Sequence, residues 1–321
     1  MRLVDGAEVE AALSYPQLVD TLAEAFRIGA VAPPRHHHTV ELKGRPPATL
    51  LLMPAWTSSA PGAVTAGKYI GIKLVTVFPD NASLGQPAVN GAYLLLSAAT
   101  GEPLALIDAP KLTVWRTAAA SALAARYLAR ADASRLLMVG AGALAGYLIR
   151  AHASVRPIRD VTVWNRSPAR AEKLAGNLAA AGLNASAAAD LEAAVRDADI
   201  ISTATISSTA LVRGAWLKPG CHVDCVGAFR PDMRETDDEV VRRARIWVDT
   251  RAGALHEAGD ILMPLQAGVI REGDIQGDLF ELARGTAPTR TSADEITMFK
   301  SVGTALEDLA AAVAIYEQRP A

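Results

Sequence analysis

The stretch over residues 136–148, LLMVGAGALAGYL, decides the fold, because it joins an apolar strand to a helix through a glycine-rich turn. Gly140 and Gly142 stand at the turn, and Ala145 takes the third position of a GxGxxA pattern. Such glycines let the backbone approach a pyrophosphate, whose charge the helix N-terminus favours. A purely structural glycine turn is the alternative, but the strand before and the helix after favour a dinucleotide site. The residues expected to contact the cofactor here are Gly140, Gly142, Ala143 and Leu144.

The same strand-then-helix order repeats downstream. Apolar strand patterns over residues 160–165 and 199–205 follow the first one, and helical patterns over 168–182 and 191–198 lie between them. Alternation at this spacing predicts a parallel, doubly wound sheet of the Rossmann type.

The N-terminal region has a different pattern. We predict a helix over residues 14–30, strands over 49–56 and 68–78, and a hairpin over 91–108 that turns at 100–103. This order is typical of a mostly antiparallel sheet. The chain is therefore predicted to be α/β, with an α+β domain over residues 1–115 and a Rossmann domain over residues 116–303.

The boundary is expected near Arg116, where the composition shifts to alanine. Arg116 is predicted to open an alanine-rich helix that joins the domains, so Arg116→Ala is expected to leave thermal stability almost unchanged. The chain ends in a pattern that we interpret as one long helix over residues 292–318. Residues 304–321 are expected to return to the first domain.

The composition limits the function classes. Of the 321 residues 50% are hydrophobic and 21% are charged, and the formal net charge is −2, which argues against nucleic acid or an anionic membrane as partner. We expect no membrane span and, because acids occupy the N-terminus, no signal peptide. Cys221 and Cys225 are expected to be buried thiols in a reducing compartment. The prediction is a cytoplasmic protein.

The end of the second strand indicates which dinucleotide is bound. Asn165 stands where an NAD enzyme usually carries an acid for the ribose 2′-hydroxyl, and Arg166 and Ser167 follow it. A neutral side chain followed by a guanidinium favours a 2′-phosphate, so we predict that NADPH is preferred over NADH. The alternative is that Arg166 only points into solvent.

Further cofactor contacts follow from position. Ligands of doubly wound sheets lie at the carboxyl ends of the strands. The residues selected in this way are Thr203, Ala204, Thr205, Val226 and Gly227.

Several separated stretches together resemble the ornithine cyclodeaminase/μ-crystallin family. They are GIKLVTVFPDN (71–81), TGEPLALIDAPKLTVWRTAAASALAARYLA (100–129), the GAGALA turn and TMFKSVGTALEDLAAA (297–312). The resemblance implies a homodimer whose first-domain sheets pack together, with a substrate cleft between the two domains. It also implies one of several activities: ornithine cyclodeaminase, alanine dehydrogenase, reductase of cyclic ketimine carboxylates, or the thyroid-hormone binding of mammalian μ-crystallin.

The resemblance also implies substrate-binding residues. Arg35, Lys73 and Arg116 match the family's basic residues, and Ser301 is a cofactor contact from the FKSVG block. Three cations would hold an α-carboxylate. A solvated surface charge is the alternative for each, but Lys73 interrupts an apolar strand and therefore needs a partner or a cleft. Lys73 and Arg116 are also the expected catalytic residues.

Phe229 distinguishes the possible reactions. The cyclodeaminases carry an acid–base aspartate two residues beyond the glycine that matches Gly227, and here Phe229 takes that place as a pocket-drying, substrate-binding ring. We therefore expect an NADPH-dependent reductase of a small cyclic imino acid, such as pyrroline-2-carboxylate or piperideine-2-carboxylate. A protonated imine can accept hydride without that acid, and either water or Lys73 manages the remaining proton. Asp232 is expected to be a turn residue beside Arg234.

The run His36, His37 and His38 invites a metal interpretation. In a strand, adjacent side chains point to opposite faces, so three consecutive histidines do not converge on one ion. We expect no metal site.

Overall fold

The structure is a computed structural model that describes residues 1–57 and 67–318. Contacts within the chain divide it into two compact units. The first unit is Met1–Thr117 with Thr304–Ala321, and the second unit is Ala118–Gly303. The helix α3 (Ala109–Leu128) contains the first junction, so the boundary expected near Arg116 falls inside a helix.

The second unit is built on an eight-stranded sheet in the order β10-β9-β8-β11-β12-β15-β13-β14, and neighbouring strands run parallel. The strands are β8 (Arg135–Val139), β9 (Asp160–Trp164), β10 (Asn184–Ala187), β11 (Ile200–Thr203), β12 (His222–Cys225), β13 (Arg245–Val248), β14 (Ile275–Asp278) and β15 (Thr297–Lys300). This arrangement confirms the predicted doubly wound parallel sheet.

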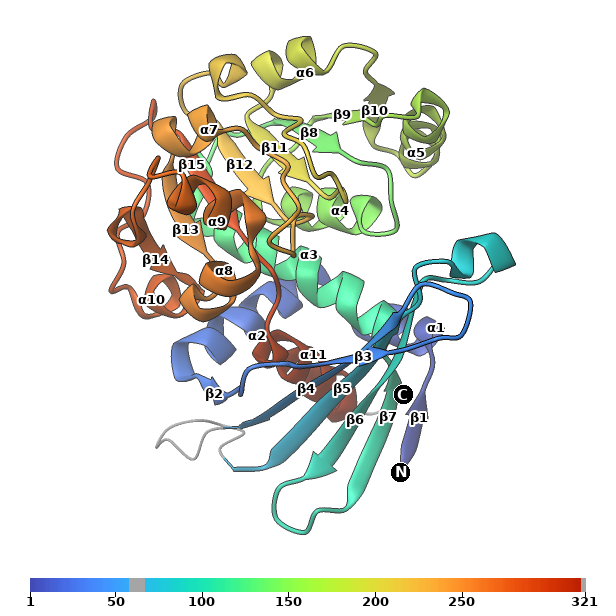
Figure 1. Cartoon of the computed structure of the whole chain (residues 1–321). Helices are drawn as coiled ribbons and strands as arrows, with labels where there is room; N and C mark the ends of the chain where they lie inside the picture. Colours follow the sequence, from blue (N-terminus) through green and yellow to red (C-terminus); the bar gives the residue numbers. More distant parts are fainter. Residues whose placement is uncertain (58–66, 319–321) are drawn as a thin grey trace. The chain divides into compact units, whose positions relative to one another are not determined.

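Helices connect these strands (Figure 1). They are α4 (Ala145–Val155), α5 (Pro168–Ala180), α6 (Leu191–Asp197), α7 (Asp238–Arg243), α8 (Arg251–Glu257), α9 (Gly259–Gln266) and α10 (Leu279–Arg284), with short 3-10 turns η2 (Gly214–Trp216) and η3 (Glu272–Asp274). The glycine turn of the sequence lies between β8 and α4, as predicted.

The first unit contains a seven-stranded sheet in the order β1-β7-β6-β5-β4-β2, with β3 also paired to β4. Its strands are β1 (Arg2–Val4), β2 (Ala30–Val31), β3 (His36–Val40), β4 (Ala48–Thr57), β5 (Tyr69–Val77), β6 (Val89–Ser97) and β7 (Pro103–Asp108). All pairs are antiparallel except β1 with β7. The predicted hairpin is confirmed as β6 and β7.

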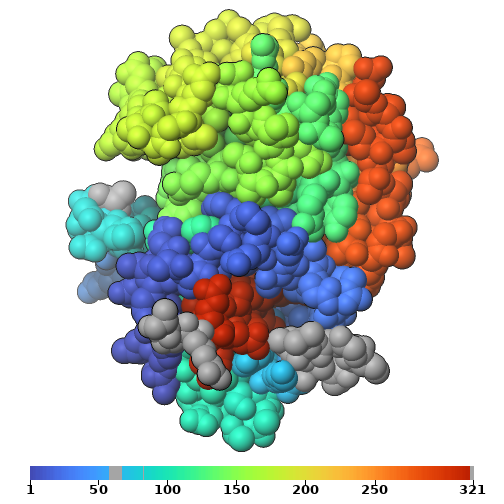
Figure 2. Space-filling model, turned by 180° about the vertical axis from the view of Figure 1, so that it is seen from behind, coloured from blue at the N-terminus to red at the C-terminus, as the bar shows by residue number. Residues whose placement is uncertain are grey.

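The helix α11 (Ala305–Glu317) packs on one face of this sheet, and α2 (Tyr15–Ile28) packs against α11. The unit also contains α1 (Gly6–Ala12), which contacts β7, and a 3-10 turn η1 (Asn81–Leu84) that follows β5. The helix predicted over residues 14–30 is therefore confirmed as α2. The C-terminal α11 packs against β4, β5, β6 and α2 (Figure 1). Seen from behind, its red surface lies against the blue N-terminal region (Figure 2).

The two faces of β5 differ in their surroundings. Gly71, Lys73 and Val75 are buried toward α11, and a Cβ built on Gly71 would lie 3.1 Å from Leu309. The alternate residues point to the other face, where Leu74 is 42% exposed. Side chains of neighbouring strands continue this apolar outer face, and the set comprises Leu52, Pro54, Trp56, Ile70, Ile72, Leu74, Leu94, Leu96 and Leu106.

The helix α3 begins earlier than predicted. It starts at Ala109, because Asp108 accepts a hydrogen bond from the Lys111 backbone N–H at 2.8 Å and Pro110 fits the first turn. Arg116 therefore lies inside the helix and does not open it, and the Asp-Ala-Pro signal in the sequence was overlooked. Over the described part of the chain, no helix has the length and apolarity needed to cross a bilayer.

The prediction of one long helix over residues 292–318 is wrong. Residues Thr297–Lys300 form β15, which is inserted between β12 and β13, and α11 begins only at Ala305. The φ of Gly303 is +81°, which separates the two elements. A short, fully buried strand cannot be distinguished from a buried helical turn by periodicity alone.

Candidate functional site

The glycine turn of the second unit is packed against the segment that follows β11. Gly140 has a φ of +114°, and a Cβ built on it would lie 2.7 Å from the Ala204 carbonyl oxygen. Both the backbone conformation and the close approach therefore require glycine at position 140. A Cβ on Gly142 would meet open space, so the backbone there is accessible to a ligand.

A hollow of about 580 Å³ lies at this edge of the sheet. Its described lining consists of Gly140, Ala141, Gly142, Trp164, Asn165, Arg166, Ser167, Arg170, Ala204, Thr205, Ile206, Ser207 and Leu211. The volume and the open glycine backbone fit a dinucleotide. Among the described residues no side chain caps α4. The N–H groups of Ala145 and Tyr147 donate to the backbone carbonyls of Gly142 and Leu144, and the helix N-terminus is the end that favours an anion.

Seven of the predicted cofactor residues are in this lining: Gly140, Gly142, Asn165, Arg166, Ser167, Ala204 and Thr205. The described lining does not include the other six, which are Ala143, Leu144, Thr203, Val226, Gly227 and Ser301. Arg170 and Ile206 were missed. Arg170 lies four residues after Arg166, in the first turn of α5, and Ile206 is a 78% exposed apolar side chain beyond β11.

Asn165 is held in place by two hydrogen bonds. Its side-chain oxygen accepts from the Ala141 N–H at 3.3 Å, and its amide donates to the Ser167 carbonyl at 3.0 Å. The side chain thus links the loop after β9 to the glycine turn, and two arginines, Arg166 and Arg170, line the same hollow.

Two predicted contacts point into the interior of the second unit. Thr203 is fully buried and donates to Glu235, a residue that the sequence interpretation missed. Ser301 is 3% exposed, and its Oγ has no hydrogen-bond partner among the described residues. A buried hydroxyl without a protein partner is compatible with a hydrogen bond to a ligand.

The predicted cations of the first unit gather around the start of α11. Lys73, 3% exposed, places its Nζ 2.9 and 2.8 Å from the two carboxylate oxygens of Asp308. Arg116 donates from Nε to the same Asp308 at 2.9 Å and from Nη1 to Glu307 at 2.6 Å. Both acids are fully buried. Two adjacent acids in the otherwise apolar start of this helix were the overlooked sequence signal.

These contacts overturn the expectation that nothing depends on Arg116 for stability. Removing its guanidinium would leave Glu307 without that donor and Asp308 with one cation fewer, in a buried environment. Uncompensated buried charge is strongly destabilising. Arg116 therefore has a structural role, whatever it does to a substrate.

Burial and charge shift the titration of this cluster. Burial lowers the pKa of Lys73 to about 8, against the opposing effect of Asp308. Burial also acts to raise the pKa of Asp308, but Arg116 and Lys73 together bring it below its ordinary value. Arg35, which immediately precedes β3, acts electrostatically on both Lys73 and Asp308. The three predicted cations are thus electrostatically coupled.

Phe229 follows β12 in the second unit. Its side chain is 45% exposed, and its N–H donates to the Gly227 carbonyl at 2.9 Å. Asp232 lies in a turn, as predicted, and pairs with the exposed Arg230 at 2.6 Å. Arg234 bonds the Thr236 carbonyl and Asp238.

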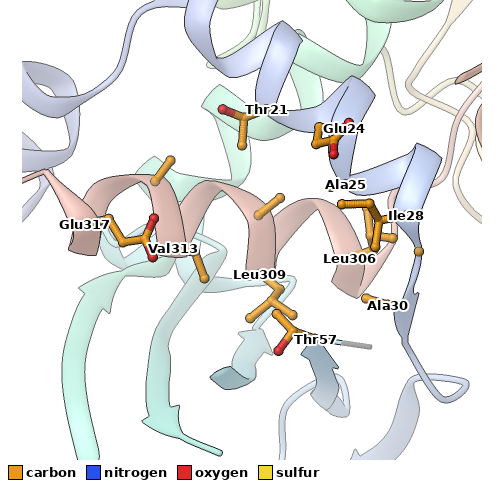
Figure 3. A pocket seen from close by; sticks show the side chains of 13 residues that line it. Thr21, Glu24, Ala25, Ile28, Ala30, Thr57, Leu306, Leu309, Val313 and Glu317 are labelled. Carbon is orange, nitrogen blue, oxygen red and sulfur yellow. The ribbon is translucent and has the colours of Figure 1, made fainter. Parts of the chain in front are cut away.

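The first unit has a second hollow of about 370 Å³ (Figure 3). Its walls come mainly from α2 and α11, with Leu309 and Val313 on one side and Ile28 on the other. Glu24 and Glu317 stand at its edge, where they already accept from Arg27 and Tyr69. Its described lining contains none of the predicted site residues.

The histidine run lies at the start of β3. His36 and His38 share a face, with ring centroids 6.4 Å apart in an edge-to-face arrangement. Within residues 1–57 and 67–318, no cluster of histidine, cysteine, aspartate and glutamate side chains is arranged to hold a metal.

The parallel sheet and its glycine turn define a dinucleotide-binding protein of the Rossmann class. The profile of the ornithine cyclodeaminase/mu-crystallin family matches residues 2–320, and the chain belongs to that family.

Three relatives show what the chain is similar to. It is 42% identical, over 89% of its length and 88% of the relative's, to a Delta(1)-pyrroline-2-carboxylate reductase of Paracoccus denitrificans. The Thermococcus litoralis Delta(1)-pyrroline-2-carboxylate reductase in complex with NADH and L-proline superimposes with a TM-score of 0.91 at 34% identity, over 99% of this chain and 97% of that one. An archaeal alanine dehydrogenase dimer with bound NAD gives 0.88 at 32% identity, over 99% and 95%.

Proposed function

We propose that this chain is a nicotinamide-dependent reductase of cyclic ketimine carboxylates, of the pyrroline-2-carboxylate or piperideine-2-carboxylate type. The observation that carries the choice of reaction is Phe229: the turn after β12 presents an apolar ring at the position where cyclodeaminases have an acid. Relatives named as pyrroline-2-carboxylate reductases support the same choice.

Lys73 and Arg116, together with Arg35, are proposed to hold the substrate carboxylate. Lys73 and Arg116 already converge on one carboxylate, that of Asp308, so their geometry suits this kind of ligand. An ammonium has three N–H donors and a guanidinium has five, which is more than two acids require. The buried acids hold the cations in place and partly neutralise them, so the substrate does not meet three unpaired charges.

The second unit is proposed to hold the dinucleotide, with the pyrophosphate at Gly140 and Gly142 and the α4 N-terminus. When bound, the reduced nicotinamide supplies a hydride to the iminium carbon. Asn165 and Arg166, with Arg170 beside them, favour a 2′-phosphate, and we therefore propose that NADPH is preferred over NADH. Ser301, with its buried hydroxyl, is proposed as a further hydrogen-bond partner.

We propose that the substrate imine needs no dedicated proton donor from the protein. A cyclic imine whose pKa is near neutrality binds already protonated, and the Phe229 ring offers it an apolar surface and no proton donor. Either Lys73 or a water manages the remaining proton. The Lys73 ammonium, with its pKa lowered to about 8, is suited to exchange a proton near neutral pH.

The outer face of the first-unit sheet is proposed to pack against a second copy of the chain. This face is apolar across several strands, with Trp56 37%, Leu74 42% and Leu106 36% exposed. Monomeric proteins rarely leave a continuous apolar surface of this kind uncovered. The similar alanine dehydrogenase is a dimer.

Cys221 and Cys225 are buried free thiols, as predicted. Free buried thiols suit a reducing compartment, and we propose the cytoplasm on that ground.

The decisive experiment is a substrate panel. The protein is incubated with NADPH and either cyclic imine, and the loss of nicotinamide fluorescence is followed; turnover supports the proposal. Ammonia and proline released from ornithine and NAD⁺ would refute the interpretation of Phe229. Oxidation of NADPH that depends on ammonium would indicate an alanine-dehydrogenase-like enzyme. A stable complex with NADPH that never oxidises it with any imine would indicate a binding protein.

A further inference from the structure

The Glu235 carboxylate accepts five hydrogen bonds from segments at the ends of two strands of the second unit. Its side chain is fully buried. One carboxylate oxygen accepts from the Thr205 N–H at 2.6 Å and from the Thr205 hydroxyl at 2.8 Å. The other accepts from the Thr203 hydroxyl at 2.8 Å and from the N–H groups of Gly227 and Ala228 at 2.7 and 3.3 Å. A single carboxylate therefore links the end of β11 to the end of β12.

The segment that Glu235 holds forms part of the nucleotide hollow. Ala204 and Thr205 line it, and they are packed tightly from two sides. A Cβ on Gly140 would lie 2.7 Å from the Ala204 carbonyl oxygen, and a Cβ on Gly227 would lie 2.3 Å from the Thr205 nitrogen. Two glycine backbones thus enclose the segment, and a small displacement of it would change the wall of the hollow.

Glu235 is itself anchored. The backbone N–H groups of Glu235 and Thr236 both donate to one oxygen of Asp260 at 2.9 Å. The other oxygen of Asp260 lies 3.2 Å from the Nζ of Lys300, which is fully buried. Lys300 immediately precedes Ser301. Burial raises the pKa of Glu235, and Lys300 opposes that shift.

We propose that Glu235 is a positioning residue for the dinucleotide, which acts through Thr205 and Gly227 and not by touching the cofactor. The inference rests on the proposed cofactor site and adds a residue to it. Its chemistry is specific: all five donors need an acceptor, and only a carboxylate has acceptors on both oxygens. A glutamine has the same shape, but its NH₂ group would face the donors of one of the two segments. That segment would then lose its hydrogen bonds to residue 235.

The test is an equilibrium titration of Glu235→Gln with NADPH and with NADH, followed by fluorescence in the absence of any imine. We expect Kd to rise about 10- to 100-fold, which corresponds to about 1.4–2.8 kcal/mol at 1.4 kcal/mol per tenfold. At saturating cofactor, kcat should stay within about threefold of wild type, because the released segment weakens binding without removing a reacting group.

Asp224→Asn is the matched control. Asp224 is also fully buried and lies in β12, but it bonds to Ser202 and His152, and among the described residues it has no hydrogen bond to the segment that Glu235 holds. This variant should lower Tm and leave the dinucleotide Kd unchanged. If Glu235→Gln lowers Tm in the same way and also leaves Kd unchanged, Glu235 is only a structural residue and the inference is overturned.

A milder variant covers the case in which Glu235→Gln does not fold. Thr203→Val removes one donor to Glu235 at nearly constant volume, and we expect about a threefold to tenfold rise in Kd, within the net value of one hydrogen bond. An unchanged Kd would overturn the inference, as would a wild-type chain that binds neither dinucleotide. A wild type that binds dinucleotide but reduces no imine would refute the proposed function and leave this inference standing.

Discussion

At the scale of single residues, Lys73 combines a buried charge with a dependence on a distant acidic partner. It stands in the middle of an apolar strand, is 3% exposed, and is balanced by an acid from a helix 235 positions away in the chain. The same ammonium group therefore carries the desolvation cost of burial and the proposed ability to bind a substrate carboxylate. This double role makes its titration measurable in two independent ways.

The first prediction concerns pH. The folded-state pKa of Lys73 is about 8 against an ordinary value of 10.5, so between these values the unfolded chain binds more protons than the folded chain. The contribution of Lys73 to unfolding free energy is therefore constant below pH 8 and rises with pH toward 10.5, by at most about 1.4 kcal/mol per unit.

Activity should change in the opposite direction. Loss of the ammonium above pH 8 should lower kcat/KM for the imine carboxylate by up to about tenfold per pH unit. Lys73→Arg keeps its charge and serves as the control, and its profile should have no break near pH 8. Urea unfolding and kcat/KM measured across the same pH range check both slopes; a wild-type profile that is flat up to pH 10 would contradict the role of Lys73.

The second prediction concerns Arg116→Ala. It removes a partner from two fully buried acids and should lower the unfolding free energy by about 3–5 kcal/mol. Any folded fraction should also lose about 10- to 150-fold in kcat/KM, the effect of one hydrogen bond to a charged group. Arg135→Ala, which breaks an exposed pair with Asp197, should cost about 1 kcal/mol or less. Equal unfolding midpoints for the two variants would show that the buried pairs contribute nothing.

The third prediction concerns cofactor choice. Arg166→Ala should lower kcat/KM with NADPH about 10- to 100-fold and leave the value with NADH nearly unchanged, because only NADPH carries the 2′-phosphate. Steady-state kinetics with both cofactors measure this. A wild type that uses NADH as well as NADPH, or better, would disprove the proposed preference.

At the scale of elements, the turn between β8 and α4 and the helix α11 decide where the chemistry is placed. The turn carries the backbone into contact with the loop after β11, and α11 carries two acids back to cations from a strand and another helix. Each of these contacts depends on one or two residues at the end of an element. At the end of β8 this residue is Gly140, and at the start of α11 the residues are Glu307 and Asp308.

The fourth prediction compares Gly140 and Gly146, which are six positions apart at the glycine turn and the start of α4. Gly140→Ala adds a Cβ at a φ of +114° and 2.7 Å from a backbone oxygen, so dinucleotide binding should be lost and Tm should fall. Gly146→Ala lies inside α4 with open space around its Cβ and should stabilise the protein by about 0.5–1 kcal/mol. Thermal unfolding and dinucleotide titration of both variants test the pair; normal binding by Gly140→Ala would contradict the proposed close approach.

At the scale of the whole molecule, the first unit presents an apolar sheet face on the side opposite α11. Strand alternation puts Lys73 on one face and Leu74 on the other, so the same strand serves the site and the proposed contact with a second copy. The dimer is therefore expected to stabilise the unit that holds the cations.

The fifth prediction is that Leu74→Arg, on the outer face, converts the protein to a monomer and lowers its thermal stability. A charge at the centre of an apolar interface would be desolvated without a partner. Leu84→Arg is the control: Leu84 is 59% exposed in η1, outside the sheet, and the change should not alter the mass. Sedimentation velocity measures the mass, and a dimeric Leu74→Arg or a monomeric wild type would disprove the proposed face.

Local pattern by itself determined much of this protein. Strand–helix alternation and the glycines of GAGALA identified the parallel sheet and the position of its glycine turn, because period and turn chemistry are properties of neighbouring residues. The sequence around Lys73 also indicated that its charge needs a partner or a cleft, because it interrupts an apolar strand.

Only the tertiary structure decided which groups meet. Asp308 lies 235 positions from Lys73, and Glu235 lies 32 from Thr203, so no local pattern indicates that they pair. The strand Thr297–Lys300 is another example, because its neighbours β12 and β13 come from elsewhere in the chain. The physical reason is the same in each case: a buried charge, or a short apolar segment, takes its structure from partners that packing brings to it.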